Sequence, residues 1–467
     1  MDKTETAAPM AASAAVEAAL RTAAENAARS ALDVRRTTWD VASGPLEERA
    51  NWERLRRHFI LDPAVTHLNA GTIGSVPRPV LDLLGRRDEY YARHPGDPYP
   101  ETTMNEARQV LAEAYGCDRD ELAIVQGATD GNARILNGLE LGDGDEVVTT
   151  THECYTMQAP LNLLHNRRGV VVRKLTPRLG ADVSAEEIVE QFEAAITPRT
   201  KVLEWAAVTF TTGTTMPTRL LAELAQRHGL ITVVDGAHLP GQFAFNLHEL
   251  GIDFLSGSGS KYQCGPMGTG ILYARNKVLP QHNPLPLPSF WPVISLWYPI
   301  EGALPPRAHG PEPAYDMATF IQKTGTTDLS RAPALRAASE IWQQIGQEHI
   351  QRYVFGLCAH IRERIVEHWG RASLFSPYDD ARLHSGMVAF QPFRDDALAL
   401  DLGKFHEFEQ RMEDEHGFNL RFTFFPVRGA ESESERYAIR LAPHLYNTFE
   451  EVDRAVDAMI KLTADMS

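Results

Sequence analysis

The sequence predicts an α/β protein with a mainly parallel, doubly wound sheet. Seven short β-rich runs follow one another between residues 122 and 273, and helical patterns of about ten residues separate several of them. Strands that alternate with helices form right-handed βαβ units, whose strands lie parallel in one sheet. Such sheets bind ligands at the carboxyl ends of their strands. We therefore expect the functional residues in the loops that follow these runs.

Length and composition exclude several classes of protein. A chain of 467 residues predicts two or three folding units, and 43% hydrophobic with 23% charged residues is ordinary for a globular protein. The formal net charge of -16 argues against nucleic acid or an anionic membrane as a partner. The four cysteines are far apart and form no C-x-x-C pair, so we expect no zinc or other metal site, no disulfides and a reducing cytoplasm.

The amino-terminal part precedes the sheet. Residues 1–50 are alanine-rich, without the apolar core of a signal peptide, and we expect an extension that is helical or disordered. Residues 51–76 are expected to form an arm, with helical spacing of apolar residues over 52–61 and a run of small residues over 66–74. No apolar run approaches the roughly 20 residues that a membrane span needs.

The large domain is expected over residues 77–332. Helices are predicted from Pro79 to Tyr91, over 103–115, over 185–196 behind a Ser184-x-x-Glu187 capping box, and over 220–226. The β-rich runs are 122–126, 146–150, 170–175, 202–208, 231–234, 254–255 and 269–273. Residues 282–313 are rich in proline and tryptophan and predict a long loop, either functional or a packed connector. Residues 333–467 predict a smaller α+β domain with helices over 333–346, 348–368 and 449–462.

Three loops after predicted strands carry residues that make chemical sense together. Lys261 lies among glycines in the run 256–270, the strand 231–234 ends in Asp235-Gly-Ala-His238, and the strand 122–126 leads into Gly127-Ala-Thr-Asp130 at the head of a helix. A lysine forms a Schiff base with an aldehyde, and a carboxylate at the end of a buried strand can keep a pyridine nitrogen protonated. The head of a helix binds phosphate. These three functions together predict pyridoxal 5'-phosphate as the cofactor.

Each residue alone also has an ordinary structural explanation. Lys261 could be solvated in a flexible turn, Asp235 could cap a turn, and Thr129 could cap a helix. His238 could be a satisfied core histidine. The joint occurrence of these residues on strand ends, in this order, favours the cofactor site.

The same motifs resemble a known family. The run 233–238, the run 258–270, Gly127-Ala-Thr-Asp-Gly131, Thr212-Gly-Thr-Thr-Met-Pro217, Gly325-Thr-Thr327 and the stretch 440–448 are similar to the class V aminotransferase superfamily of fold-type I pyridoxal-phosphate enzymes. Within it, the chain most resembles the isopenicillin N epimerase group. The resemblance covers about residues 65–462 and implies a homodimer with active sites at the subunit interface.

The resemblance also implies a role for individual residues. Lys261 would form the Schiff base and act as the base, Asp235 would pair with the pyridine nitrogen, and His238 would lie near the phenolic oxygen. Tyr155 would stack on the cofactor and is a candidate proton donor, with Cys154, His152 and Tyr262 as weaker candidates. Asn69 and Arg440 would bind the substrate, Arg440 through the α-carboxylate. The residues expected to hold the phosphate are Gly127, Ala128, Thr129, Ser258 and, from the neighbouring subunit, Thr326.

The reaction is less specified than the cofactor. Relatives that desulfurise cysteine have a histidine before the lysine, where this chain has Ser260, and a nucleophilic cysteine on a late loop, where residues 420–426 have none. This departure argues against a cysteine desulfurase. An epimerase is expected first, then a C–S or β-lyase, a decarboxylating enzyme or an aminotransferase. A cofactor-binding scaffold without turnover is the alternative of another class.

Overall fold

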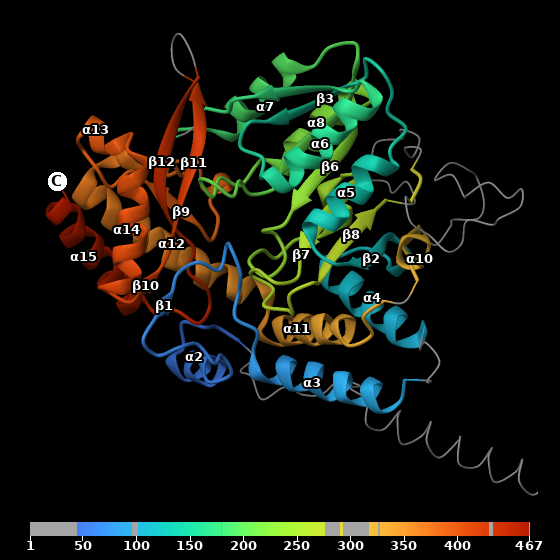
Figure 1. Cartoon of the computed structure of the whole chain (residues 1–467), viewed down its shortest axis with the longest axis horizontal. Coiled ribbons are helices and arrows are strands. Elements are labelled where there is room, and N and C mark those ends of the chain that lie inside the picture. The colour runs from blue at the N-terminus through green and yellow to red at the C-terminus, as the bar shows by residue number, and fades with distance from the viewer. Residues whose placement is uncertain are drawn as a thin grey trace, which may run out of the picture.

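Figure 1 shows the chain as a computed structural model, which describes residues 44–95, 101–178, 180–275, 290–292, 317–325, 327–428 and 433–466. The extension over residues 1–43, Thr326 and most of the predicted loop over 282–313 lie outside the described residues. Among the described helices, none combines the length and the apolar character that crossing a membrane requires.

The centre of the fold is a seven-stranded sheet in the order β2-β8-β7-β6-β5-β3-β4. Its neighbours pair in parallel except at β8, which runs antiparallel to both β7 and β2. The predicted mainly parallel sheet is thereby confirmed. Its strands are β2 (Leu122–Val125), β3 (Glu146–Thr150), β4 (Val171–Leu175), β5 (Thr200–Ala206), β6 (Ile231–Gly236), β7 (Phe254–Ser258) and β8 (Gly270–Ala274).

Apolar residues on both faces of this sheet pack against helices. Val148, Leu203 and Val234 belong to one buried cluster, while Val147 and Val202 belong to a second. Because successive residues of a strand point to opposite faces, the two clusters lie on the two sides of the sheet. The helices that follow its strands are α5 (Ala128–Gly138), α6 (Tyr155–Arg168), α7 (Ala185–Ala195), α8 (Thr218–His228) and α9 (Leu247–Leu250).

The capping box predicted before α7 is present. Ser184 Oγ accepts from the backbone N–H of Glu187 (3.3 Å), and the Glu187 carboxylate accepts from the backbone N–H of Ser184 (2.9 Å). The helix therefore begins where the sequence predicts, because two of its unpaired N-terminal donors are satisfied by side chains.

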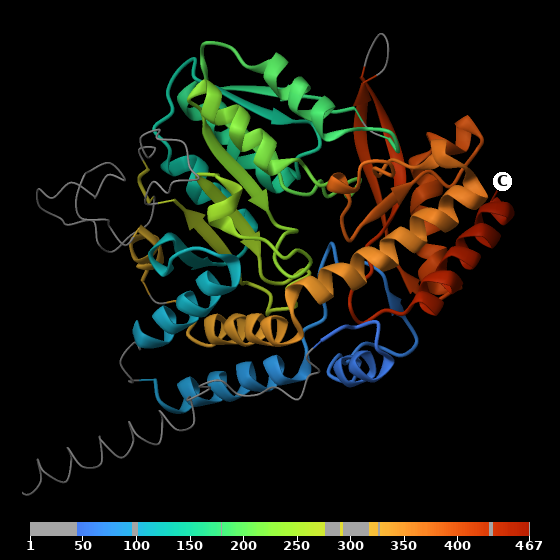
Figure 2. The same ribbon diagram turned by 180° about the vertical axis from the view of Figure 1, so that it is seen from behind.

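The arm connects the two parts of the molecule. After α2 (Arg49–Arg56) it forms β1 (Thr66–His67), which pairs in parallel with β10 (Phe418–Asn419). The predicted helix over 52–61 ends early because the chain turns to bury Phe59, whose ring lies 5.1 Å from that of Tyr446. Figure 2 shows α3 (Arg78–Arg93) beside α11 (Arg331–Ile345), with α4 (Glu101–Tyr115) against the same helix.

The C-terminal part is an α+β unit around a three-stranded antiparallel sheet, in the order β11-β12-β9. Its strands are β9 (Val388–Phe390), β11 (Arg421–Arg428) and β12 (Glu433–Leu441). Its helices are α12 (Gln347–Trp369), α13 (Asp396–Ala399), α14 (Leu402–Asp414) and α15 (Phe449–Met466), with short 3-10 turns at Arg371–Ser373 and Ala381–Leu383. The remaining elements are α10 (Met317–Gln322) and a 3-10 turn at Arg119–Glu121.

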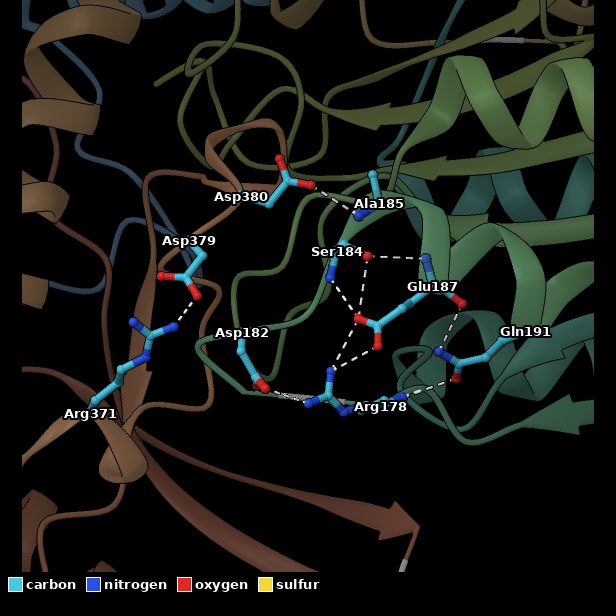
Figure 3. A network of polar contacts seen from close by, with 9 residues as sticks. All are labelled: Arg178, Asp182, Ser184, Ala185, Glu187, Gln191, Arg371, Asp379 and Asp380. Atoms are coloured by element: carbon cyan, nitrogen blue, oxygen red, sulfur yellow. Dashed lines mark hydrogen bonds and ion pairs between the residues drawn. The ribbon is translucent and has the colours of Figure 1, made fainter.

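A polar network joins the two units at the start of α7 (Figure 3). Asp380 Oδ2 accepts from the backbone N–H of Ala185 (3.0 Å), and the N–H groups of Tyr378 and Asp379 both donate to the carbonyl of Ala181 (2.9 Å each). Burial opposes ionisation of Asp380, but the Arg382 guanidinium outweighs it and lowers the Asp380 pKa to about 2. The contacts fix the small unit against the strand ends of the large sheet.

Candidate active site

A cavity lies at the carboxyl ends of β5 and β6. Ala206, the last residue of β5, and Asp235, near the end of β6, both line it. Lys261 and His238 come from the loops after β7 and β6. The position agrees with the rule that open parallel sheets bind ligands beyond their strand ends.

Lys261 is held in a tightly folded loop. A Cβ added to Gly74 would lie 2.1 Å from the Lys261 carbonyl oxygen, so only glycine lets the arm pass this close. The Nζ of Lys261 lies 3.0 Å from Nε2 of His238. Burial lowers the pKa of Lys261, while the charge of Asp235 acts in the opposite direction. The lysine is therefore placed as a desolvated amine inside the cavity, which suits a nucleophile or base.

Asp235 is a buried carboxyl group facing the same cavity. Its Oδ1 accepts from the backbone N–H of Ala237 (2.9 Å). Burial raises its pKa, and both the Ala237 N–H and the charge of Lys261 act against that rise. A cationic N–H partner in the cavity would favour the ionised form of this carboxyl.

His238 closes the side of the cavity next to Lys261. Its Nε2 also lies 2.9 Å from the carbonyl oxygen of Gly71, in the arm. Burial, and then the charges of Lys261 and Arg440, lower its pKa well below the usual range. His238 is therefore a neutral ring at physiological pH, able to donate or accept one hydrogen bond but not to carry charge.

The head of α5 supplies the group of residues predicted to hold a phosphate. Gly127 is the N-cap, with φ of 153°, and a Cβ added to it would meet no heavy atom within 4 Å. Ala128 and Thr129 open the helix, whose first N–H groups have no partners inside the helix. Ser258 is the last residue of β7 and is buried. The site thus offers an open space beside helix N–H groups, as an anion requires.

Arg440 in β12 is a buried guanidinium bonded to neutral groups. Its side chain is 3% exposed. Nη1 donates to the Phe210 carbonyl (2.6 Å), and Nη2 donates to Asn69 Oδ1 (2.9 Å) and Thr72 Oγ1 (3.1 Å). Its Nε, also buried, makes no hydrogen bond to any described residue. Burial lowers the Arg440 pKa to about 10, so the site favours an anion that would compensate the charge.

Of the predicted site residues, Lys261, Asp235 and His238 line the cavity, and its lining does not include Gly127, Ala128, Thr129, Ser258, Asn69, Arg440 or Tyr155. Tyr155 is the first residue of α6, but its side chain is 73% exposed, and the neighbours Cys154 and Thr156 line the cavity instead. Thr326 lies outside the described residues. Their roles stay predictions.

Two partners of Arg440 could not be predicted from the sequence, because they carry little local signal. Thr72 bonds Arg440 from the small-residue run of the arm. Phe210 lines the cavity and offers only its carbonyl to Arg440. A backbone carbonyl has no residue signature. The small-residue run over 66–74 contains the hydroxyl of Thr72, and this hydroxyl is a sequence signal for a polar contact.

Comparison with known proteins identifies the family. The sequence pattern of the Aminotransferase class-V family matches residues 98–454. The chain belongs to this family. The match confirms the family predicted from the motifs, and with it an enzyme fold of fold-type I.

Class-V relatives differ in their named activities. Isopenicillin N epimerase from Streptomyces clavuligerus is 29% identical over 423 residues, covering 89% of this chain and 99% of that relative. Isopenicillin N epimerase from Amycolatopsis lactamdurans is 29% identical over 422 residues, covering 88% of this chain and 98% of the relative. A probable cysteine desulfurase from Halalkalibacterium halodurans is 25% identical over 340 residues, covering 70% of this chain and 77% of the relative.

Solved structures of class-V type share the fold. An apo cysteine desulfurase from Thermococcus onnurineus NA1 aligns with a TM-score of 0.68 at 21% identity, covering 88% of this chain and 98% of that one. A C-DES variant with glycine covalently linked to its PLP cofactor aligns with a TM-score of 0.68 at 20% identity, covering 87% and 98%. These similarities establish the arrangement of sheet and helices.

The residues at the cavity fit pyridoxal phosphate. The cavity supplies a buried lysine amine and a buried carboxyl at a strand end for the cofactor's aldehyde and ring nitrogen, and the open head of α5, which is outside the cavity lining, offers helix N–H groups for the phosphate. The buried Nε of Arg440, which has no partner among the described residues, leaves room for a further acceptor. Lys261, Asp235 and the Gly127–Thr129 segment would hold the three parts of the cofactor.

Among the described residues one group has the arrangement of metal ligands, although the sequence predicts none. Ligand atoms of Asp118, Glu121 and His248 lie within 4.8 Å of one another. Glu121 closes a capping box with the backbone N–H of Asp118 (3.1 Å), and His248 Nε2 lies 2.5 Å from Glu121 Oε2. Capping and this pairing account for the cluster, so we assign it no metal.

Proposed function

We propose that this pyridoxal-phosphate enzyme removes the α-proton of an amino acid or a derivative and returns it, as an epimerase does. The observation that carries the proposal is the pair of isopenicillin N epimerases, each 29% identical to this chain and matched over 98% or more of its own length. The second support is the absence of cysteine from the segment 420–426, where the desulfurases that the chain resembles have their nucleophile.

Lys261 is the proposed base. When bound, pyridoxal phosphate makes the α-proton of an attached amino acid acidic by delocalising the electrons left behind. The amine of Lys261 is buried in the cavity, and burial lowers its pKa, so a larger fraction is neutral and able to accept a proton. Nε2 of His238, 3.0 Å away, orients the amine.

Asp235 and Arg440 orient the reacting molecules. Asp235, held by the Ala237 N–H, would keep the cofactor nitrogen protonated from the end of β6. Arg440 would take the substrate carboxylate, with Asn69 and Thr72 fixing the plane of its guanidinium. Asp235 comes from the large unit and Arg440 from the small unit, so the proposed site lies where the two units meet.

The return of the proton requires an acid on the face opposite Lys261. Tyr155 was predicted for this role, but its ring would have to turn inward from a position that is 73% exposed. Cys154, one residue earlier, already lines the cavity. The geometry therefore favours Cys154 over Tyr155 as the proton donor.

A C–S lyase is the second candidate, and a specific observation favours it. Cys154 is the cysteine that lines the cavity, whereas Cys264 and Cys358 are buried in the core. A thiol in the same cavity as Lys261 could give its proton to the sulfur that leaves the β-carbon of a cysteine-like substrate, while Lys261 takes the α-proton. An aminotransferase and a decarboxylase have no such supporting contact.

Reaction in heavy water separates the candidates. The purified, cofactor-loaded protein is incubated with a panel of amino acids and small peptides, and the products are analysed by chiral chromatography and mass spectrometry. An epimerase incorporates solvent deuterium at the α-carbon and yields both stereoisomers. Release of ammonia with pyruvate or persulfide, without recovery of the second stereoisomer, would refute the epimerase and support the lyase.

We further propose that the protein acts as a homodimer in the cytoplasm, with Thr326 reaching the phosphate of the neighbouring subunit. The support is the family resemblance of the Gly325-Thr-Thr327 motif. Sedimentation of the purified protein tests the dimer. Mixing a Lys261→Ala chain with a Thr326→Val chain tests the shared site, because only mixed dimers would regain one intact site.

A further inference from the structure

Two buried glutamates lie behind Asp235. Glu204 is in the middle of β5, two residues before Ala206, which pairs with Asp235 across the sheet. Glu204 therefore points to the same face as Asp235. Glu153 lies in the loop between β3 and α6 and reaches β5, where its Oε1 accepts from the backbone N–H of Ala206 (2.9 Å). Both carboxyl groups are buried, and neither lines the cavity.

The hydrogen bonds of the two glutamates leave one oxygen of each unpaired. Glu153 Oε1 also accepts from Thr150 Oγ1 (3.0 Å), and Glu204 Oε2 accepts from Thr149 Oγ1. Glu153 Oε2 and Glu204 Oε1 are buried with no hydrogen-bond donor among the described residues. The two side chains are neighbours, because each contributes to the pKa of the other. A proton on one of the two free oxygens would satisfy both, one as donor and one as acceptor.

The pKa shifts of Glu153 and Glu204 also favour a proton on one of the two carboxyl groups. Burial, and then the charge of Asp235, raises the pKa of Glu153 to about 7. Burial and the charge of Glu153 raise the pKa of Glu204 well above its usual range, and Asp235 adds to the rise. The donors that face the pair are threonine hydroxyls and a backbone N–H, all neutral. Lys261 acts on Asp235 from the far side, so ionising all three carboxyls would leave uncompensated buried charge.

We propose that Glu153 and Glu204 share one proton and that this acid pair tunes how firmly a proton is held at Asp235. Neither glutamate touches the cavity, so they are positioning residues that act through Asp235 and the end of β5. With one proton, the pair carries a single negative charge. This negative charge lies near Asp235 but outside the cavity, and it favours a protonated group that binds Asp235 inside the cavity. This consequence for the cofactor rests on the proposed function, whereas the shared proton does not.

Infrared spectroscopy of the full-length protein tests the shared proton. A protonated carboxyl has a carbonyl stretch that is separate from that of a carboxylate, and it shifts when H₂O is replaced by D₂O. Glu204→Gln is expected to remove one such acid band at neutral pH. The matched control is Glu146→Gln. Glu146 is also buried, but it accepts from Thr197 Oγ1 (2.6 Å) and pairs with Arg199 (2.8 Å). This variant should therefore remove only a carboxylate band.

A measurement on the unmodified protein covers the case in which a variant fails to fold. With carboxyl-¹³C glutamate, the resonances of ordinary glutamates ionise near pH 4.3. We expect at least one resonance to remain protonated at pH 7, and Glu153→Gln to change that resonance. If every glutamate ionises below about pH 5, or if the acid band persists in both Glu153→Gln and Glu204→Gln, the acid pair is refuted.

The effect on the cofactor is measured separately. In the double variant Glu153→Gln/Glu204→Gln the visible absorption band of the bound cofactor should titrate with a midpoint about one pH unit lower than in the unmodified protein, because the single negative charge of the pair is lost, whereas Glu204→Gln alone leaves that charge on Glu153. An unchanged midpoint would refute the tuning role. An acid pair present in a protein with no visible band would refute the proposed function and leave the shared proton standing.

Discussion

Replacing Arg440 by lysine should abolish the preference of the site for a carboxylate. The guanidinium is buried and makes three hydrogen bonds, all to neutral oxygens of Phe210, Asn69 and Thr72. A guanidinium has five N–H donors, so two remain after these contacts, and the buried Nε is one of them. A lysine at this position would keep the positive charge but lose the planar fork that holds a carboxylate through more than one bond.

The size of the effect follows from the bonds that are lost. A hydrogen bond to a charged group contributes about 1.5–3 kcal/mol. Loss of one such bond, with poorer placement of the remaining charge, should weaken carboxylate binding by about 2–4 kcal/mol, which corresponds to roughly 30- to 1000-fold in the dissociation constant.

The assay compares an amino acid with the amine that lacks its carboxylate. Each is titrated into the cofactor-loaded protein while the visible absorption band is followed, and the ratio of the two dissociation constants is the readout. In the unmodified protein the amino acid should bind more tightly, and in Arg440→Lys the ratio should approach one. The ratio is independent of general damage to the fold, which would weaken both ligands.

A matched control is available on the neighbouring strand. Arg421 pairs with Arg440 in the β11–β12 register, but its side chain is half-exposed and faces Glu409 at 3.8 Å. Arg421→Lys should leave the ratio unchanged, since an exposed ion pair contributes little. If Arg440→Lys keeps the full preference for the carboxylate, Arg440 does not bind it.

Three further outcomes are expected. Asp235→Asn should weaken cofactor binding and reduce α-proton exchange by at least about 100-fold. Its control is Asp253→Asn, which removes a buried partner of Arg275 and should lower stability without changing the visible spectrum of the cofactor. Burial raises the Glu153 pKa to about 7 from an ordinary 4.5. The stability that its proton contributes is therefore complete below pH 4.5 and is lost as the pH rises to about 7. Glu153→Gln should flatten the pH dependence of the unfolding midpoint between these two pH values, and an unaltered slope would contradict the pKa shift. Tyr155→Phe should change α-deuterium exchange by less than about threefold, whereas Cys154→Ala should lower epimerisation about 100-fold; the reverse pattern would assign the donor to Tyr155.

The sheet could be predicted because its strands are buried on both faces. The run Phe254–Ser258 is apolar or small without interruption, and Ile231–Gly236 is apolar or small up to Asp235, which is typical of central parallel strands. The capping box at Ser184 fixed the start of α7 for a local reason. The end of α2 could not be predicted, because Phe59 turns toward Tyr446, almost four hundred residues away in sequence.

The candidate site divides in the same way. Lys261, Asp235 and the head of α5 follow strands and could be placed from sequence. The contacts of Arg440 to Thr72 and Phe210 span 368 and 230 residues, and one of them uses a backbone carbonyl. Glu204 is a charged residue among the buried apolar residues Val202, Leu203 and Trp205 of its strand, and this is a signal that the sequence contains. Its partner Glu153 becomes visible only when the loop after β3 is folded over β5.

The central claim is that Lys261 holds the cofactor, and chemical trapping tests it most directly. The cofactor-loaded protein is treated with borohydride, which makes the covalent link permanent, then digested and analysed by mass spectrometry. We expect the peptide that contains Lys261 to carry the mass of the reduced cofactor, and Lys261→Ala to carry none. A label on another lysine, or a visible band that survives unchanged in Lys261→Ala, would contradict the assignment.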